Sequence, residues 1–180
     1  MADLYLVRHG QTELNVQNIL QGWHDSPLTE RGREQALATR AAFEARGISF
    51  DHAYSSPLGR ARHTAELIVG EDLPIEPVDD LREWRLGSLE GTSNRDMPPQ
   101  PWGDYPVAFG GESEAQLRAR MVVALSRIMF RPQHDCVLAV SHGSACQEFL
   151  RCVTGSGEQP DNGAVLHFGH FDGAFSLLGW

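Results

Sequence analysis

The chain has 180 residues and a formal net charge of −9, from 24 acidic and 15 basic side chains. This length suits one domain, and we expect residues 1–180 to form it. A field of this sign repels nucleic acid and anionic membrane surfaces, and the sequence contains no apolar run of the roughly 20 residues that cross a bilayer. We therefore predict a cytoplasmic protein that binds neither nucleic acid nor membranes.

All 15 basic residues are arginine, so the chain lacks the lysine that P-loop proteins, protein kinases and Schiff-base enzymes require. Its three cysteines are Cys136, Cys146 and Cys152. They form no C-x-x-C pair, which argues against a disulfide framework and against a zinc ribbon. We predict reduced, buried thiols, with Cys146 and Cys152 packed as small apolar groups.

The first predicted element is a buried strand over the apolar residues 4–7, which ends at Arg8-His9-Gly10. Thr29 is placed to cap a helix that runs to about Arg46, with Gly47 as its stop signal. The apolar positions predict that one side of this helix is buried, the side that carries Ala36, Leu37 and Ala41.

A second strand is predicted over residues 50–54, followed by a serine cap and Pro57 at the first position of a helix. This helix should turn four apolar side chains inward: Leu58, Ala61, Ala65 and Ile68. Residues 74–78 predict a further short strand, and the proline-containing stretch 79–111 reads mostly as a loop.

Ser113 and Gln116 have the spacing of a capping box, and apolar residues recur after them at helical intervals as far as Met129. A buried strand is predicted over residues 136–140, and Ser141-His142-Gly143 lies between it and a further helix. Near the end, residues 164–171 and 174–178 flank Asp172-Gly173, a hairpin turn signal.

Strands that alternate with helices predict a single-domain α/β fold with a mostly parallel sheet and helices on both faces. Ligands in such sheets bind at the carboxyl ends of the strands. Three predicted strands end in polar groups, which should therefore meet at one edge: Arg8-His9-Gly10, Ser55-Ser56 with Arg60, and Ser141-His142-Gly143.

Two histidines and two arginines at one sheet edge suit a phosphate monoester. Arginine makes bidentate, charge-assisted bonds to phosphate oxygens, and a neutral imidazole can attack phosphorus. A cage of Arg8, Arg60 and His142 around His9 would neutralise the phosphoryl oxygens and place the nucleophile in line with the leaving group. This chemistry needs no metal and no cofactor, and we predict neither.

The sequence resembles the histidine phosphatase superfamily, also called phosphoglycerate mutase-like, over nearly its whole length. The R-H-G-[EQ]-[ST] signature stands at residues 8–12, and the family's phosphate-contacting Asn matches Asn15. Residues 21–29 resemble the G-W-x-D-x-P-L-T segment, residues 56–61 the S-x-L-x-R-A motif, and residues 81–91 the L-x-E-x-x-x-G-x-x-E-G motif. The S-H-G motif is Ser141-His142-Gly143.

The resemblance implies the phosphoglycerate mutase-like fold and a role for each matched residue. His9 becomes phosphorylated, Arg8, Arg60 and His142 bind the phosphoryl group, and Glu83 protonates the leaving oxygen before water attacks the phosphohistidine. Glu90 and Glu112 are rival acids. Asn15, Gln21 and Gly22 are implied contacts of phosphate or substrate, and Gly143 would offer a backbone N–H at a helix start.

The family contains phosphatases and mutases with the same histidine cage. Cofactor-dependent phosphoglycerate mutases are longer and carry Lys, Arg and Tyr in an insertion that binds the glycerate carboxylate, whereas residues 92–110 offer only Arg95 and Tyr105. We therefore expect hydrolysis of a small-molecule phosphate monoester, as in broad-specificity or alpha-ribazole phosphatases. Four side chains could line a partly apolar pocket above the phosphate: Trp84, Met97, Trp102 and Tyr105.

Four other readings stay open. A phosphoglycerate mutase-like transfer would use the same cage, and a protein phosphohistidine phosphatase would share residues 8–10 but generally lacks the acid segment. A non-catalytic module would retain the same fold and bind phosphate without hydrolysing an ester. A metallophosphatase is a further alternative, but the sequence contains no H-E-x-x-H motif or carboxylate-rich cluster to support it. The sequence leaves the oligomeric state and the physiological substrate open.

Overall fold

The computed structural model describes residues 1–71 and 73–179, which contain a six-stranded sheet in the order β3-β2-β4-β1-β5-β6. The strands β1 (Ala2–Arg8), β2 (His52–Ser55), β3 (Ile75–Pro77) and β4 (Cys136–Ser141) are parallel. The last two, β5 (Val165–Phe171) and β6 (Ala174–Gly179), form an antiparallel hairpin, and β5 pairs antiparallel with β1. The predicted α/β fold with a mostly parallel sheet is confirmed.

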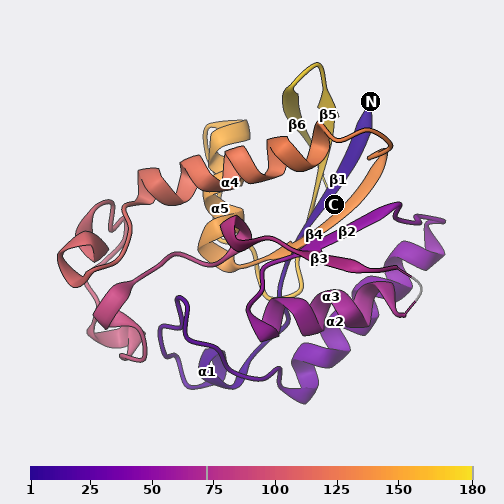
Figure 1. The fold of residues 1–180 in the computed structure, drawn as a ribbon. Helices are drawn as coiled ribbons and strands as arrows, with labels where there is room; N and C mark the ends of the chain where they lie inside the picture. Colours follow the sequence, from indigo (N-terminus) through magenta and orange to yellow (C-terminus); the bar gives the residue numbers. More distant parts are fainter. Residues whose placement is uncertain (72, 180) are drawn as a thin grey trace.

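Helices cover both faces of the sheet, as predicted (Figure 1). On one face lie α2 (Glu30–Ala45) and α3 (Gly59–Val69), and on the other α4 (Glu114–Met129) and α5 (Gly143–Thr154). Successive side chains of the central strand β1 point to opposite faces of the sheet and contribute to both hydrophobic cores. Leu4 and Leu6 pack in one core cluster, and Tyr5 and Val7 pack in the other.

Two irregular segments extend beyond the carboxyl ends of the strands and lie side by side (Figure 1). One contains the short helix α1 (Glu13–Val16), and the other contains the 3-10 turns η1 (Asp79–Leu81), η2 (Gly87–Leu89), η3 (Asn94–Asp96) and η4 (Tyr105–Phe109). Backbone hydrogen bonds join them, with Leu20 N donating to Thr92 O and Gly91 N to Leu20 O. These two segments form the walls above the sheet edge.

Local signals located two helix starts correctly. The Thr29 hydroxyl accepts from Gly32 N at the start of α2, and Ser113 and Gln116 form the predicted capping box of α4. The buried side of α2 was predicted wrongly, since Leu37 is 48% exposed and Ala41 is also exposed. The stripe that faces the sheet contains Gly32, Ala36, Thr39 and Phe43. Neighbouring positions lie about 100° apart on a helix, and on α2 this rotation turns Leu37 out of the stripe that contains Ala36.

The start of α3 was also predicted wrongly. The helix begins at Gly59, beyond Pro57, and Leu58 in the cap position makes no side-chain bond to the first turn. The acceptor comes instead from the segment before α2, because the Asp25 carboxylate accepts from Gly59 N and Arg60 N. Of the inward positions, Ala61, Ala65 and Ile68 are buried as predicted.

The C-terminal hairpin turns at Asp172 and Gly173, both with positive φ, as the sequence predicted. The three cysteines are free; Cys146 is buried, Cys136 is half-buried, and Cys152 is exposed, which makes its predicted burial wrong. Within the described part of the chain, every helix is too short or too polar to cross a bilayer.

Candidate active site

The carboxyl ends of β1 and β4 bring the two histidines together. Arg8 and Ser141 are paired in register, and His9 N donates to Ser141 O at 3.0 Å. The rings of His9 and His142 pack with their centroids 5.1 Å apart. Arg60, in the first turn of α3, places its Nε 3.3 Å from Nε2 of His9. The residues predicted from three separate strand ends therefore meet at one edge of the sheet.

The hydrogen bonds of His9 determine which ring nitrogen carries the proton and which accepts from Arg60 Nε. Nδ1 lies 2.7 Å from the carbonyl oxygen of Gly10, which can only accept, so Nδ1 carries the proton. In the neutral ring, Nε2 then presents its lone pair toward Arg60. Burial, followed by the positive charges of Arg60 and Arg8, holds the pKa of His9 well below its usual value. The geometry thus maintains a neutral imidazole whose Nε2 can act as a nucleophile.

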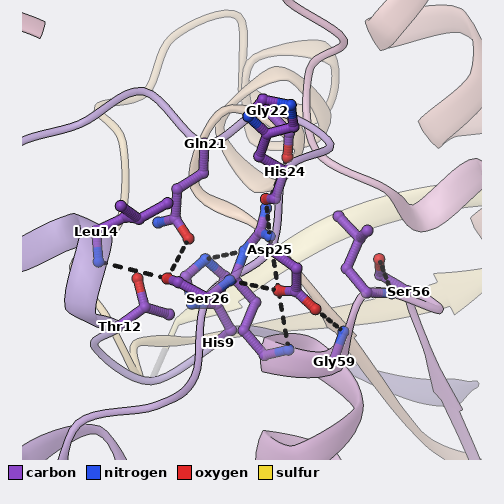
Figure 2. A network of polar contacts seen from close by, with 12 residues as sticks. His9, Thr12, Leu14, Gln21, Gly22, His24, Asp25, Ser26, Ser56 and Gly59 are labelled. Carbon is purple, nitrogen blue, oxygen red and sulfur yellow. Dashed lines mark hydrogen bonds and ion pairs between the residues drawn. The ribbon is translucent and has the colours of Figure 1, made fainter. Parts of the chain in front are cut away.

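Arg60 is 1% exposed and is held by the loop around α1. Its Nη2 donates to the carbonyl of Gly22 at 2.7 Å, and its Nη1 donates to His24 O and to Asp25 (Figure 2). Gly22 has φ +51, and a Cβ there would lie 2.4 Å from Oε1 of Glu90. A glycine at this position therefore allows the turn whose carbonyl fixes the guanidinium.

Asp25 was not singled out in the sequence. Its carboxylate pairs with Arg60 Nη1 at 3.0 Å and also accepts from the first backbone N–H groups of α3 (Figure 2). One side chain thus holds both the guanidinium and the helix that carries it. The only sequence signal was its place in the segment 21–29, because the contact joins residues 34 positions apart.

Arg8 and His142 keep polar atoms that the protein does not use. Nη1 of Arg8 donates to Pro160 O at 2.6 Å, whereas its Nε is buried without a hydrogen-bond partner among the described residues. Both ring nitrogens of the fully buried His142 also lack one there. Burial, then Arg60 and His9, holds the pKa of His142 well below its usual value. Since unsatisfied buried polar atoms are rare, these groups are available to bind a ligand.

Glu83 is fixed at the N-terminus of α5. Its carboxylate accepts from the backbone N–H groups of Trp84, Ser144 and Ala145 at 2.8 to 3.1 Å. The rival acids are engaged elsewhere. Glu112 pairs with Arg120, and Glu90 accepts from His24 N and Leu86 N. Of the three acids, Glu83 is the one that lines the cavity beside His9.

A cavity of about 310 Å³ opens above His9. Arg8, Arg60, Asn15, Gln21 and Gly22 line it together with Trp84 and Trp102, whereas Met97 and Tyr105, which we expected there, do not. His142, which is fully buried against His9, and Gly143 are not among the residues that line it. Gly143 is the first residue of α5, and a Cβ there would lie 3.1 Å from Cζ of Arg8.

Asn15 and Asn162 connect the two sides of the cavity floor. Oδ1 of Asn15 accepts from Thr12 N, and Nδ2 of Asn162 donates to it and to the carbonyl of His9. Asn162 was missed in the sequence, as was Gln159, because both lie in an irregular segment before β5. Among residues 1–71 and 73–179, no three His, Cys, Asp or Glu side chains are grouped as metal ligands would be.

Comparison with known proteins connects this arrangement to relatives. A phosphoglycerate mutase of the 2,3-bisphosphoglycerate-dependent type from Beijerinckia indica is 43% identical over 168 residues, 84% of this chain and 81% of its own. YhfR of Bacillus stearothermophilus has a TM-score of 0.84 at 31% identity, covering 99% of this chain and 96% of its own. The alpha-ribazole phosphatase of Shigella flexneri has a TM-score of 0.82 at 26% identity, with coverages of 97% and 94%.

One of these relatives is thus named a mutase and another is named a phosphatase. The family model that matches is the histidine phosphatase superfamily, branch 1, and the match covers residues 4–180. Such a match over nearly the whole chain includes every segment that builds the cavity. The chain therefore belongs to branch 1 of the histidine phosphatase superfamily, whose members are phosphatases or mutases.

Proposed function

We propose that the protein is a metal-independent phosphatase that hydrolyses small phosphate monoesters through a phosphohistidine on His9. The observation that carries the proposal is the state of His9 itself. Its Nδ1–H is bound to Gly10 O, and its Nε2 faces a cavity that two arginines line within the described residues. A neutral nucleophile and two fixed positive charges are what attack on a phosphate dianion requires.

In the first step, Nε2 of His9 forms a bond to phosphorus while the bond from phosphorus to the ester oxygen breaks. Arg8, Arg60 and His142 stabilise the negative charge on the three remaining oxygens. Glu83, which enters this step in its protonated form, gives its proton to the departing alkoxide, so that an alcohol leaves. Asn15, Gln21 and the N–H of Gly143 contribute to positioning the phosphate or substrate at the cavity floor.

In the second step, water attacks the phosphohistidine. Glu83, now a carboxylate, takes a proton from this water, and the P–N bond breaks to release inorganic phosphate and restore His9. Glu83 is placed for both steps because three backbone N–H groups fix its carboxylate beside the nucleophile. General acid–base assistance of this kind typically contributes about 10²- to 10⁴-fold.

Hydrolysis is favoured over mutase transfer by the charges in the cavity. Within the described residues, its cationic lining consists of Arg8 and Arg60, and His9 contacts Arg60 directly. A mutase must also hold the carboxylate of phosphoglycerate and a bisphosphorylated intermediate, which calls for further cations. The 43% identity to a protein named as a mutase keeps transfer as the second candidate, in which a second alcohol replaces water.

The test measures phosphate release from para-nitrophenyl phosphate and alkyl monoesters with excess EDTA, beside isomerisation of 3-phosphoglycerate with added 2,3-bisphosphoglycerate. We expect chelator-resistant hydrolysis that disappears in His9→Ala. In Glu83→Gln, hydrolysis of alkyl esters should fall by about 10²- to 10⁴-fold, and that of para-nitrophenyl phosphate less, because nitrophenolate leaves without a proton. Glu13→Gln removes an exposed carboxylate outside the cavity and is the matched control.

Alkaline denaturation during turnover should trap phosphate on wild-type protein but not on His9→Ala, because the P–N bond of phosphohistidine survives base and is hydrolysed in acid. Activity that EDTA abolishes, or that persists in His9→Ala, would contradict the mechanism. Isomerisation faster than hydrolysis would identify the mutase instead.

A further inference from the structure

The walls of the cavity above the phosphate-binding residues are neutral and rich in amides. Seven asparagine or glutamine side chains line it, among them Asn18, Gln21, Asn94 and Gln100. Intramolecular hydrogen bonds use only part of their capacity. Gln21 accepts at Oε1 from Ser26, and Asn94 donates from Nδ2 to Asn18. A carboxamide both donates and accepts, so these groups match a ligand whose hydroxyls do the same.

Two tryptophans add an apolar surface to the same cavity. Trp84 donates its indole N–H to Glu112 O, and Trp102 donates its own to Pro98 O. Both polar edges are therefore occupied by the backbone, and the rings present carbon to the cavity. Their centroids lie 6.0 Å apart at an angle of 43°, which makes an angled apolar wall. Such a wall suits the C–H face of a sugar ring better than an anion, because the face of an aromatic ring carries partial negative charge.

The charged residues of the cavity lining also favour a neutral leaving group. Apart from Arg8 and Arg60 at the phosphate end, no arginine of the described chain lines the cavity, and the acid that does is Glu83. Arg95 follows Asn94 in η3 but is exposed and is not part of the lining. A carboxylate on the leaving group would lose water without gaining a cation, in a protein of net charge −9.

We propose that the preferred substrates are monophosphate esters of neutral, hydroxyl-rich alcohols of the sugar type, and that esters with a carboxylate on the leaving group are discriminated against. The inference rests on the proposed phosphatase function and names the substrate class of the same site. The amides bind the hydroxyls and the tryptophans pack against the ring carbons. The absence of a third arginine among the described lining residues disfavours a second anion.

A matched pair of esters tests the charge. Glycerol 3-phosphate and 3-phosphoglycerate differ mainly by a CH₂OH group in place of a carboxylate. We expect kcat/KM to be on the order of tenfold or more higher for glycerol 3-phosphate, and higher again for glucose 6-phosphate, which can also pack on the tryptophans. Para-nitrophenyl phosphate with and without the His9→Ala change reports on the phosphatase function separately.

Asn94→Arg places a cation in the cavity wall and should reverse part of the preference. We expect kcat/KM for 3-phosphoglycerate to rise on the order of tenfold relative to kcat/KM for glycerol 3-phosphate. Ala38→Arg adds the same charge at an exposed position of α2 and should change neither. Trp102→Ala should lower kcat/KM for glucose 6-phosphate more than for glycerol 3-phosphate, whereas Tyr105→Ala, an exposed aromatic outside the lining, should not.

If wild-type protein hydrolyses para-nitrophenyl phosphate through His9 but prefers 3-phosphoglycerate over glycerol 3-phosphate, the substrate class is wrong and the phosphatase function stands. The loss of that preference in Arg95→Gln would then identify the cation responsible. Equal rates for the matched pair would also overturn the substrate class. If no ester is hydrolysed in a His9-dependent manner, both proposals fail.

Discussion

The imidazole of His9 differs from a solvent-exposed one because it is buried beside two guanidinium groups. Burial, then Arg60 and Arg8, lowers its pKa, so the ring stays neutral at a pH where an ordinary histidine is half protonated. A lowered pKa shifts protonation to more acid solution. The proposed nucleophile therefore stays unprotonated below pH 6.5, the usual pKa of histidine.

This shift can be measured residue by residue with an NMR titration of His9 in the free protein. We expect Arg60→Gln to raise the pKa of His9 toward its ordinary value, because it removes the positive charge that lowers this pKa most. Arg62→Gln removes an exposed arginine two positions along α3 and should leave the titration of His9 unchanged. An equal response to both substitutions would mean that the Arg60 contact is not what tunes the ring.

The N-terminus of helix α3 is capped by a side chain from another segment of the chain. The Asp25 carboxylate accepts from Gly59 N and Arg60 N and pairs with the Arg60 guanidinium. A cap acceptor typically stabilises a helix by roughly 0.5–2 kcal/mol. Because the same carboxylate orients Arg60 in the cavity, the proposed function predicts that stability and substrate binding are coupled through one side chain.

Asp25→Ala should therefore lower the free energy of unfolding by about 1 kcal/mol and also lower kcat/KM, chiefly by raising KM, as Arg60 loses its partner. Ser113→Ala removes the cap of α4 and should lower stability by a similar amount with no effect on kcat/KM. Denaturant unfolding and steady-state kinetics on both variants decide the matter. Equal kinetics in Asp25→Ala and wild type would show that Asp25 is a cap alone.

The same element shows which parts of the structure a sequence can predict. The caps at Thr29 and Ser113 were predicted because the bonding atoms are three residues apart along the chain. The cap at Asp25 was missed, and the start of α3 misplaced, because the acceptor comes from another segment. Likewise, the strand ends that place His9 and His142 follow from local patterns, whereas loop packing alone decides that Trp102 lines the cavity and Tyr105 does not.

Folding buries His9 and His142 together at the carboxyl ends of the neighbouring strands β1 and β4. Both have pKa values held well below that of an exposed histidine, first by burial. Between that lowered value and about pH 6.5, the unfolded chain binds more protons than the folded one. Stability is then complete above about pH 6.5 and is lost as the pH falls toward the folded-state pKa values.

We expect the free energy of unfolding, measured with urea, to be flat near pH 7.5 and to fall between pH 6.5 and 5, by at most about 1.4 kcal/mol per pH unit for each buried histidine. His142→Asn should flatten this fall, since one titrating ring is removed from the core. Leu138→Ala creates a cavity under a fully buried position of β4 and should lower stability by about 2–5 kcal/mol at every pH without changing the slope. A slope in His142→Asn as steep as in wild type would mean that the buried imidazoles are not what links folding to protons in this range. If the slope does flatten, the arrangement that keeps the imidazoles neutral makes the fold sensitive to acid.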